Sequence, residues 1–311
     1  MNRRQFFTFI AAMPSLARAF SSTQRPEVAF TFDDPRTEDS GTLQWPQVNE
    51  RLLHTLEKHN LKVVLFVCGM RIDSEQGHKL LSEWNASGHG LGNHTYSHRF
   101  FNGSEGKNKI TLAEFQNDTL KNEPLISSYS HFVRLFRFPF FKEGDTVEKR
   151  DGMRTFLQQH NYRSGRATID ASDWAISARM EARMKADPKA DLTPYRDFYL
   201  QHIWERAQFY NSLADRVLEH PVRHTVLLHH NALNAMFLDN LIAMFKQRGW
   251  NPIDAEHAYA DPVYDRQPNI LPAGESLIWG LAKETGKFEK ELRYPGEDDT
   301  YENPKMDALK L

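Results

Sequence analysis

The sequence predicts an α/β fold in which helices cover a parallel sheet. Short apolar runs alternate with amphipathic stretches from residue 28 to residue 249, and this alternation is typical of parallel strands joined by helices. The apolar runs are nearly continuous, as expected for strands that are buried on both faces. The 311 residues, of which 40% are hydrophobic and 26% charged, allow a sizeable core. This length fits one barrel-like domain better than two domains.

The first residues are predicted to be an export signal and not part of the fold. Residues 1–19 combine a basic start, a short apolar run and a small-x-small site, "ARA", at residues 17–19. The letters "RRQFF" at residues 3–7 resemble a twin-arginine signal, which exports folded proteins. The alternative is a cytosolic chain with a basic end. We expect removal of residues 1–19 and a protein in the periplasm or outside the cell.

The first half of the chain is predicted to alternate strand and helix. Residues 28–34 ("VAFTFDD") form an apolar run that ends in two acids, which indicates a buried strand. Residues 45–60 have apolar side chains at helical spacing. The β-rich run 62–69 stops at a glycine, and a helix over 74–88 begins at Ser74 and ends at Gly88. A short strand, "HGLGNHT", follows.

The second half repeats this alternation up to Gly249. Thr111 and Glu114 have the spacing of a capping box, which indicates the start of a helix. Further on we expect strands over 135–141, 162–170 and 225–230 and helices over 195–218 and 231–249. The pattern then weakens, so we expect residues 261–311 to form a tail that wraps the domain and has a mobile end.

Charge and cysteine content exclude several classes of protein. The formal net charge is −2, so no basic field attracts nucleic acid or an anionic membrane. The single cysteine, Cys68, excludes an internal disulfide and a cysteine-based zinc site. We expect it to be a small buried side chain. No apolar run after the first residues approaches the roughly 20 residues that span a bilayer.

Polar side chains gather at the carboxyl ends of the predicted strands, where parallel α/β folds carry their chemistry. The members, in chain order, are Asp33, Asp34, His94, His98, Arg137, Asp170, Asp173, Trp174, His229 and His230.

Two acids and two histidines of this set suggest a metal site. Adjacent strand residues point in opposite directions, so one of Asp33 and Asp34 would bind a cation and the other would act beside it as a base. The alternative is a turn or cap before Pro35. If His94 and His98 lie on a helix, their side chains are about 5–6 Å apart and share a metal. Two histidines and one aspartate with an open position are typical of a catalytic zinc.

A second pair, His220 and His224, has the same spacing. Pro221 disrupts a helical face there, and no strand that ends in a carboxylate precedes the pair. We therefore exclude this pair as a metal site.

Five short motifs resemble those of one family. "TFDD", "HTYSH", "RFPFF", "DASDW" and "LLHHN" occur in the order of the motifs of the polysaccharide deacetylase family, also called NodB-homology or carbohydrate esterase family 4. The resemblance covers roughly residues 28–260. It implies a distorted (β/α) barrel of the NodB-homology type as a single domain over residues 20–260. It also implies a divalent metal, usually zinc and sometimes cobalt or nickel, and hydrolysis of N-acetyl or O-acetyl groups on sugars.

The resemblance also implies roles for individual residues. Asp33 would be the general base, Asp34, His94 and His98 would be the metal ligands, and His229 would be the general acid, with His230 as its rival. Arg137 and a backbone amide near Phe140 would come from the third motif. Asp170 or Asp173 would orient Arg137 or tune His229. Phe140, Phe141, Trp174 and Leu227 would contact the sugar, although Trp174 also suits plain core packing.

Two positions depart from the family pattern. Pro35 stands where a glycine usually follows the acids, which stiffens this loop and removes an N–H group. Phe140 and Phe141 stand where smaller residues are common, which makes the rim of the groove more apolar.

The function predicted from these residues is metal-dependent removal of acetyl groups, chiefly N-acetyl, from a polysaccharide, with release of acetate. One alternative is a metal-dependent amidohydrolase that acts on a non-sugar C–N bond, because the aromatic rim also suits a flat heterocycle. The other is an inactive relative that binds glycan. The sequence leaves open the polymer, the metal and the oligomeric state.

Overall fold

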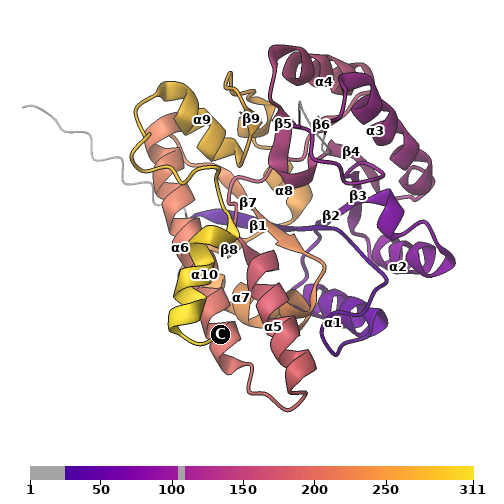
Figure 1. Ribbon diagram of the computed structural model, residues 1–311, viewed down its shortest axis with the longest axis vertical. Helices are drawn as coiled ribbons and strands as arrows, with labels where there is room; N and C mark the ends of the chain where they lie inside the picture. The colour runs from indigo at the N-terminus through magenta and orange to yellow at the C-terminus, as the bar shows by residue number, and fades with distance from the viewer. Residues whose placement is uncertain (1–24, 104–108) are drawn as a thin grey trace, which may run out of the picture.

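A curled sheet of seven strands forms the centre of the molecule (Figure 1). The computed structural model describes residues 25–103 and 109–311. The strand order is β6-β4-β3-β2-β1-β7, with β8 beside the start of β1, and every pair in this sheet is parallel. The strands are β1 (Glu27–Asp33), β2 (Val64–Val67), β3 (Gly90–Asn93), β4 (Phe132–Phe136), β6 (Arg163–Ser164), β7 (Arg223–His229) and β8 (Asn251–Pro252).

One short segment joins the two edges of this sheet. Arg163 and Ser164 pair with β4 at one edge, and Ile169 pairs with Val226 of β7 at the other. The chain between residues 163 and 169 therefore bridges β4 and β7 and curls the sheet into a distorted barrel. Only two of these residues are regular strand, because the backbone turns between its two partners. The predicted α/β barrel is confirmed, whereas the predicted continuous strand over 162–170 is wrong.

Helices surround the sheet. They are α1 (Trp45–Lys58), α2 (Glu75–Ala86), α3 (Leu112–Ile126), α4 (Val147–Gln159), α5 (Asp173–Ala186), α6 (Thr193–Leu218), α7 (Ala232–Gln247), α8 (Ala255–Tyr259), α9 (Leu277–Thr285) and α10 (Asp299–Ala308). The predicted caps are present: Ser74 accepts a hydrogen bond from the Gly77 N–H at 3.1 Å, and Thr111 and Glu114 form a capping box. No helix among the described residues is long and apolar enough to cross a bilayer.

The last fifty residues lie against this core. α9 packs on α6, and α10 packs on α5 (Figure 1). The strand β9 (Ala273–Gly274) pairs with β5 (Lys142–Gly144) in a small antiparallel sheet. The end of the chain forms α10, whose Glu302 and Met306 side chains are fully buried, where we expected a mobile end. The predicted signal over residues 1–19 lies outside the described residues.

The predicted strand over 135–141 ends earlier than expected. β4 stops at Phe136, and Pro139–Phe141 form a single 3-10 turn. Phe140 and Phe141 adopt positive φ angles of 56° and 53°, which no strand contains. The apolar run there is a turn at the mouth of the barrel, and its length alone suggested a strand.

Candidate active site

The carboxyl ends of β1, β3, β4 and β7 surround a cleft of about 860 Å³. Asp33 at the end of β1 lies opposite His229 at the end of β7, so the register of these two strands brings an acid and a histidine to the same level. The predicted site residues that line the cleft are Asp33, Asp34, His94, His98, Phe140, Phe141, Asp170, Trp174, Leu227, His229 and His230.

Both acids of the first motif face this cleft. Asp33 is the last residue of β1, whereas Asp34 has a φ of 57°. This left-handed conformation ends the alternation of the strand, so Asp34 does not point away from the side that Asp33 occupies. Such backbone strain is common at functional sites. We expected the two carboxylates to point in opposite directions because adjacent residues of a regular strand do so. Asp34 lies beyond the end of the strand, so this expectation does not apply to it.

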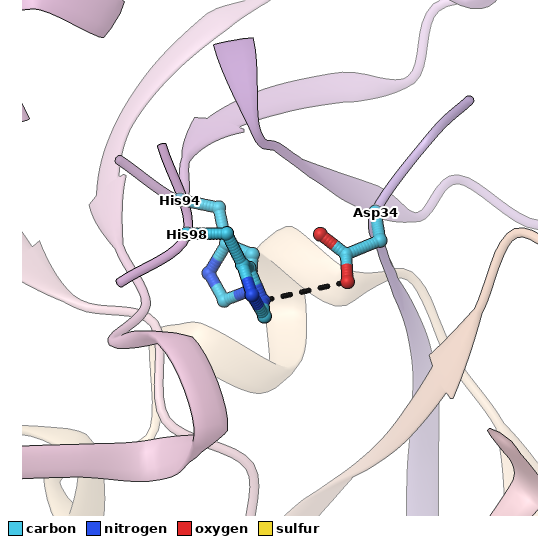
Figure 2. Close-up of side chains that lie close together, drawn as sticks. All are labelled: Asp34, His94 and His98. Carbon is cyan, nitrogen blue, oxygen red and sulfur yellow. Dashed lines mark ion pairs between the residues drawn. The ribbon is translucent and has the colours of Figure 1, made fainter. Parts of the chain in front are cut away.

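His94 and His98 lie next to Asp34 (Figure 2). Their ring centroids are 5.0 Å apart, and His98 Nε2 is 3.4 Å from Asp34 Oδ2. The segment that carries them is not a helix, contrary to our assumption. It is a bend in which Thr95 and His98 have φ angles of 63° and 50°, and this bend brings both rings to one side.

The donor atoms of these three residues fit a divalent metal. One ligand atom from each of Asp34, His94 and His98 lies within 4.8 Å of the others. His94 Nδ1 is 2.8 Å from the carbonyl oxygen of Arg137, which only accepts, so this nitrogen carries the hydrogen and Nε2 keeps its lone pair. Asp34 Oδ1 is buried and accepts no hydrogen bond, although Arg71 Nε lies 3.3 Å away as an ion pair. A buried carboxylate beside two imidazoles is expected where a cation binds.

The charges of this set favour a cation as well. Burial raises the pKa of Asp34, but His98, His94 and Arg71 together outweigh burial and lower it below 3.8. Burial lowers the pKa of His94 and of His98 to about 4. The set therefore contains one carboxylate and two neutral imidazoles at neutral pH, which is the protonation state that a metal needs.

Asp33 is held by a buried arginine. Arg137 donates a hydrogen bond from one terminal nitrogen to Asp33 Oδ1 at 2.5 Å. Burial raises the pKa of Asp33 to about 6, although the charge of Arg137 opposes this rise. A carboxyl with a pKa near the working pH suits a general base.

Arg137 is itself fixed by the barrel interior. It donates to the Gly165 carbonyl at 2.7 Å, to the Thr31 hydroxyl at 2.8 Å and to the Tyr259 hydroxyl at 3.0 Å. Thr31 belongs to the "TFDD" motif. Gly165 and Tyr259 lie outside the five motifs, and no pattern in the sequence pointed to them.

His229, the register partner of Asp33 on the neighbouring strand, forms a pair with Asp173. His229 Nδ1 lies 2.7 Å from Asp173 Oδ1, and the His229 backbone N–H donates to the other oxygen at 3.0 Å. Burial lowers the pKa of His229, but the charge and hydrogen bond of Asp173 outweigh this and raise it to about 9. Asn231 and Asn234 donate to the same carboxylate and fix it further.

His230 has a different environment. It is almost fully buried against Trp84, and its Nε2 lies 3.4 Å from Asn49 Oδ1. Burial lowers its pKa to about 3. Of the two histidines, His229 is the one whose environment keeps a proton at neutral pH.

Of the two acids in the fourth motif, only Asp173 contacts His229. Asp170 lines another part of the cleft, near Glu275 and Glu297. Neither Asp170 nor Asp173 forms a hydrogen bond with Arg137. The aromatic residues are at the rim: Phe140 is 54% exposed and its ring lies 4.6 Å from that of His98, and Trp174 is 44% exposed. Phe141 and Leu227 are buried together beneath them.

The histidine pair that we excluded as a metal site and the single cysteine lie as expected. His224 is buried and bonded to Thr168 and Asn211, whereas His220 is exposed, so these two do not form a site. Cys68 is buried, and burial raises the pKa of its thiol to about 12.

A second group with metal-binding residue types lies under the C-terminal tail. It contains His202, Glu297 and Glu302. Arg206 donates to Glu297 at 2.8 Å, and Arg293 donates to both glutamates at 2.7 Å. Because two arginines already neutralise these carboxylates, this group is an ion-pair network.

Known proteins share both the sequence pattern and the fold. The family model described as polysaccharide deacetylase matches residues 21–164. The peptidoglycan-N-acetylglucosamine deacetylase of Bacillus cereus is 28% identical over 160 residues, which are 51% of this chain and 50% of that protein. The chain therefore spans about half the length of this curated relative.

The solved structures that resemble the chain show the fold. A carbohydrate esterase family 4 pseudoenzyme from Bacillus anthracis matches with a TM-score of 0.52 and 17% identity over 75% of this chain and 65% of that one. A mutant of that pseudoenzyme with restored enzymatic activity matches with a TM-score of 0.51 and 18% identity over 75% and 67% of the two chains.

Proposed function

The chain belongs to the polysaccharide deacetylase family, and from this premise we propose that it hydrolyses N-acetyl groups on an amino-sugar polymer with the help of a divalent metal. The observation that carries the proposal is the group Asp34, His94 and His98, with Asp33 and His229 beside it at the ends of the neighbouring strands β1 and β7. Zinc is the metal that we propose, because two imidazoles and one carboxylate with an open position suit it; cobalt or nickel would also fit.

In this proposal one residue of the chain accepts a proton and another donates one. A divalent metal held by Asp34, His94 and His98 would supply positive charge that polarises an acetyl carbonyl and activates water. Asp33 accepts a proton from the attacking water, and Arg137 keeps its carboxylate in place. His229 donates a proton to the departing amine, and Asp173 holds the imidazole in its charged form. A backbone N–H near Phe140 would stabilise the developing oxyanion.

The aromatic rim supports a sugar as the substrate. Phe140 and Trp174 present apolar ring faces at the cleft, and such faces pack on the apolar side of a pyranose ring. A non-sugar amide remains the second candidate, because the same rings also suit a flat heterocycle.

A third candidate is an inactive glycan-binding protein. The pseudoenzyme from Bacillus anthracis shares this fold, so the fold alone does not establish activity. An active enzyme is supported by the presence of the base, the acid and all three ligands in one cleft, with the buried partners Arg137 and Asp173 behind the base and the acid.

We further propose an exported protein whose catalytic domain spans residues 20–260, with residues 261–311 as an extension. Export is supported by the twin-arginine-like letters at residues 3–7 and by the wall polymer that the Bacillus cereus relative's name specifies. Proteolytic mapping of the secreted protein's N-terminus tests the cleavage site: a start near Phe20 is expected, and an intact Met1 in the cell interior would contradict it.

Acetate release tests the activity. The protein is incubated with peptidoglycan, chitin oligomers or an acetylated exopolysaccharide, with and without a chelator. We expect acetate from at least one of these and none after chelation. Acetate from simple non-sugar amides alone would favour the amidohydrolase, and tight glycan binding without acetate would favour the inactive relative.

A further inference from the structure

We propose that the part of the cleft lined by Asp170, Glu275 and Asp298 binds the protonated amine of an already deacetylated sugar residue, so that the preferred substrate is an amino-sugar polymer with some free amines. This inference rests on the proposed function and names its substrate class. The three acids are called the acidic subsite below.

The acidic subsite belongs to the same cleft as the candidate metal ligands. Asp170 follows the barrel-closing segment, whereas Glu275 and Asp298 come from the C-terminal extension that lies beyond the matched residues 21–164. A cleft of about 860 Å³ is near the upper end of the range for small-ligand sites, roughly 300–1,000 Å³, and has room for more than one sugar ring.

Asp170 is a buried acid without a side-chain partner. It is 6% exposed and lines the cleft, and no side chain of residues 25–103 and 109–311 forms an ion pair or hydrogen bond with it. Burial and the charges of Glu297 and Glu275 raise its pKa well above 3.8, and neither Lys142 nor the Ala171 backbone amide offsets this. A carboxyl in this condition gains most from a cation that enters the cleft.

The charge of the acidic subsite is only partly balanced. Lys142 forms an ion pair with Glu275 and is the one cation among the cleft-lining residues there, so three carboxylates share one ammonium group. Glu297 lies beside them but is neutralised by Arg206 and Arg293. The Lys142–Glu275 pair also shows that an ammonium group fits against these carboxylates.

The spacing of the acids favours an organic cation over a metal ion. The described groups whose ligand atoms lie within 4.8 Å of one another are Asp34, His94, His98 and His202, Glu297, Glu302. The acidic subsite is not one of them, so its carboxylates are too far apart to share one ion. An ammonium group on a sugar can form a charge-assisted hydrogen bond with one carboxylate and be attracted electrostatically by the other two.

Aromatic side chains flank the acidic subsite. Trp174 is 44% exposed and Tyr294 is 63% exposed, and both line the cleft. Gly296 lets the chain that carries Tyr294 and Asp298 approach Glu275, because a side chain at this position would overlap the Glu275 carboxylate. Rings for the sugar face and carboxylates for its amine are therefore adjacent in one cleft.

A binding measurement tests the proposal without turnover. The full-length protein is titrated with the tetramer of glucosamine and with cellotetraose, which has hydroxyl groups in place of the amines. The titration is made at about neutral pH, because burial raises the pKa of Asp170 and raises that of Glu275 to about 7, so that a more acidic solution would neutralise both acids. Neither ligand carries an acetyl group. We expect the glucosamine tetramer to bind about tenfold more tightly or better, as one charge-assisted contact implies.

Variants identify the residues responsible. Asp170→Asn and Glu275→Gln should each reduce the preference for the glucosamine tetramer to about threefold or less. Glu181→Gln is the matched control, because Glu181 of α5 also lines the cleft but accepts hydrogen bonds from the Ser40 and Ser177 hydroxyls. It should keep the preference. Equal binding of the two tetramers, or a preference that survives both variants, would overturn the proposal.

Acetate release from the tetramer of N-acetylglucosamine is measured on the same preparations. It tests the proposed deacetylase activity separately from the acidic subsite. Absence of acetate from this tetramer and from every polymer named above would contradict the proposed function, whereas the ratio of binding constants decides the acidic subsite independently. Calcium chloride is included as a probe of a metal site, and calcium binding that is lost in Asp170→Asn would also contradict the ammonium assignment.

Discussion

At the scale of single residues, two charged pairs set the protonation of the acid and the base. Arg137 neutralises and positions Asp33, and Asp173 does the same for His229. Burial raises the pKa of Asp33 to about 6, and Asp173 is the main group that holds the pKa of His229 at about 9 against burial. Environments that push two titratable groups apart in this way are typical of an acid and base assignment.

Substitution of the base and of a ligand should have different effects. Asp33→Asn should keep the metal but lower kcat by about 10²–10⁴, because the proton acceptor is lost and the ligands remain. His94→Ala should lose both metal and turnover. Metal analysis of the purified variants, together with acetate release, distinguishes them. Full metal content in His94→Ala would show that the ligand assignment is wrong.

The pair of His229 and Asp173 predicts a pH dependence. The charged imidazole is the form that donates, so activity falls as pH rises through the pKa of His229. Asp173→Asn removes the charge that raises this pKa, and the alkaline limb of the kcat/KM profile should move to lower pH by about one to two units. Asp170→Asn should leave the limb in place. An unmoved limb in Asp173→Asn would exclude His229 as the acid.

At the scale of elements, the small β5–β9 sheet joins the C-terminal extension to the cleft. Lys142 of β5 pairs with Gly274 of β9, and the Glu275 N–H donates to the Phe141 carbonyl at 3.0 Å. Gly274 has a φ of 137°, and a methyl group there would overlap the Phe141 carbonyl oxygen. This glycine is required for the close approach of the two strands.

Two glycine substitutions test the role of this sheet. Gly274→Ala should lower the free energy of unfolding by about 2–3 kcal/mol, because both its conformation and its contact are incompatible with a side chain. Gly286→Ala, at the end of α9, also has a positive φ but meets no atom within 4 Å, so it should cost about 1 kcal/mol. Urea denaturation measures both. Equal losses would show that the contact at Gly274 is unimportant.

The elements that the sequence predicts best are those with local signals. Ser74 and the Thr111–Glu114 capping box are chemical start signals that act within one turn, and both helices begin there. The "RFPFF" run has no such signal, and its turn depends on positive φ at Phe140 and Phe141, which the barrel mouth imposes. The bend at His94–His98 was missed for the same reason: the spacing of two histidines is compatible with both a helix and a bend.

At the scale of the whole molecule, the order of the five motifs predicted which residues meet, because carboxyl ends of parallel strands share one edge. The cleft wall from Glu275 to Asp298 was not predictable. Its residues follow no strand of the central sheet, and they reach the cleft because β9 pairs with β5 and because α9 and α10 pack on α6 and α5 (Figure 1).

Packing of this extension should depend on Glu302. The residue is fully buried and bonded to Arg293 at 2.7 Å, with His202 Nδ1 at 3.1 Å. Burial raises its pKa, but His202 and Arg293 outweigh burial and lower it from 4.5 to about 2. A folded-state pKa below the unfolded one stabilises the fold above about pH 4.5, and this contribution is lost as the pH falls towards 2.

Glu302→Gln should therefore lower the free energy of unfolding by about 3 kcal/mol at neutral pH, with a smaller difference from the wild type in acid. Glu291→Gln removes an exposed partner of Arg216 and should change stability little at either pH. Denaturant titrations over this pH range measure both. A difference for Glu302→Gln that does not shrink in acid would contradict the ion-pair network.

The most direct test of the account is acetate release while zinc is added back to chelator-treated protein, with an N-acetylglucosamine oligomer as the substrate. The account predicts that acetate release starts at background and saturates at one zinc per chain, and that His98→Ala shows no such saturation. Acetate release that is independent of added metal, or none at any zinc concentration for any acetylated sugar, would contradict it.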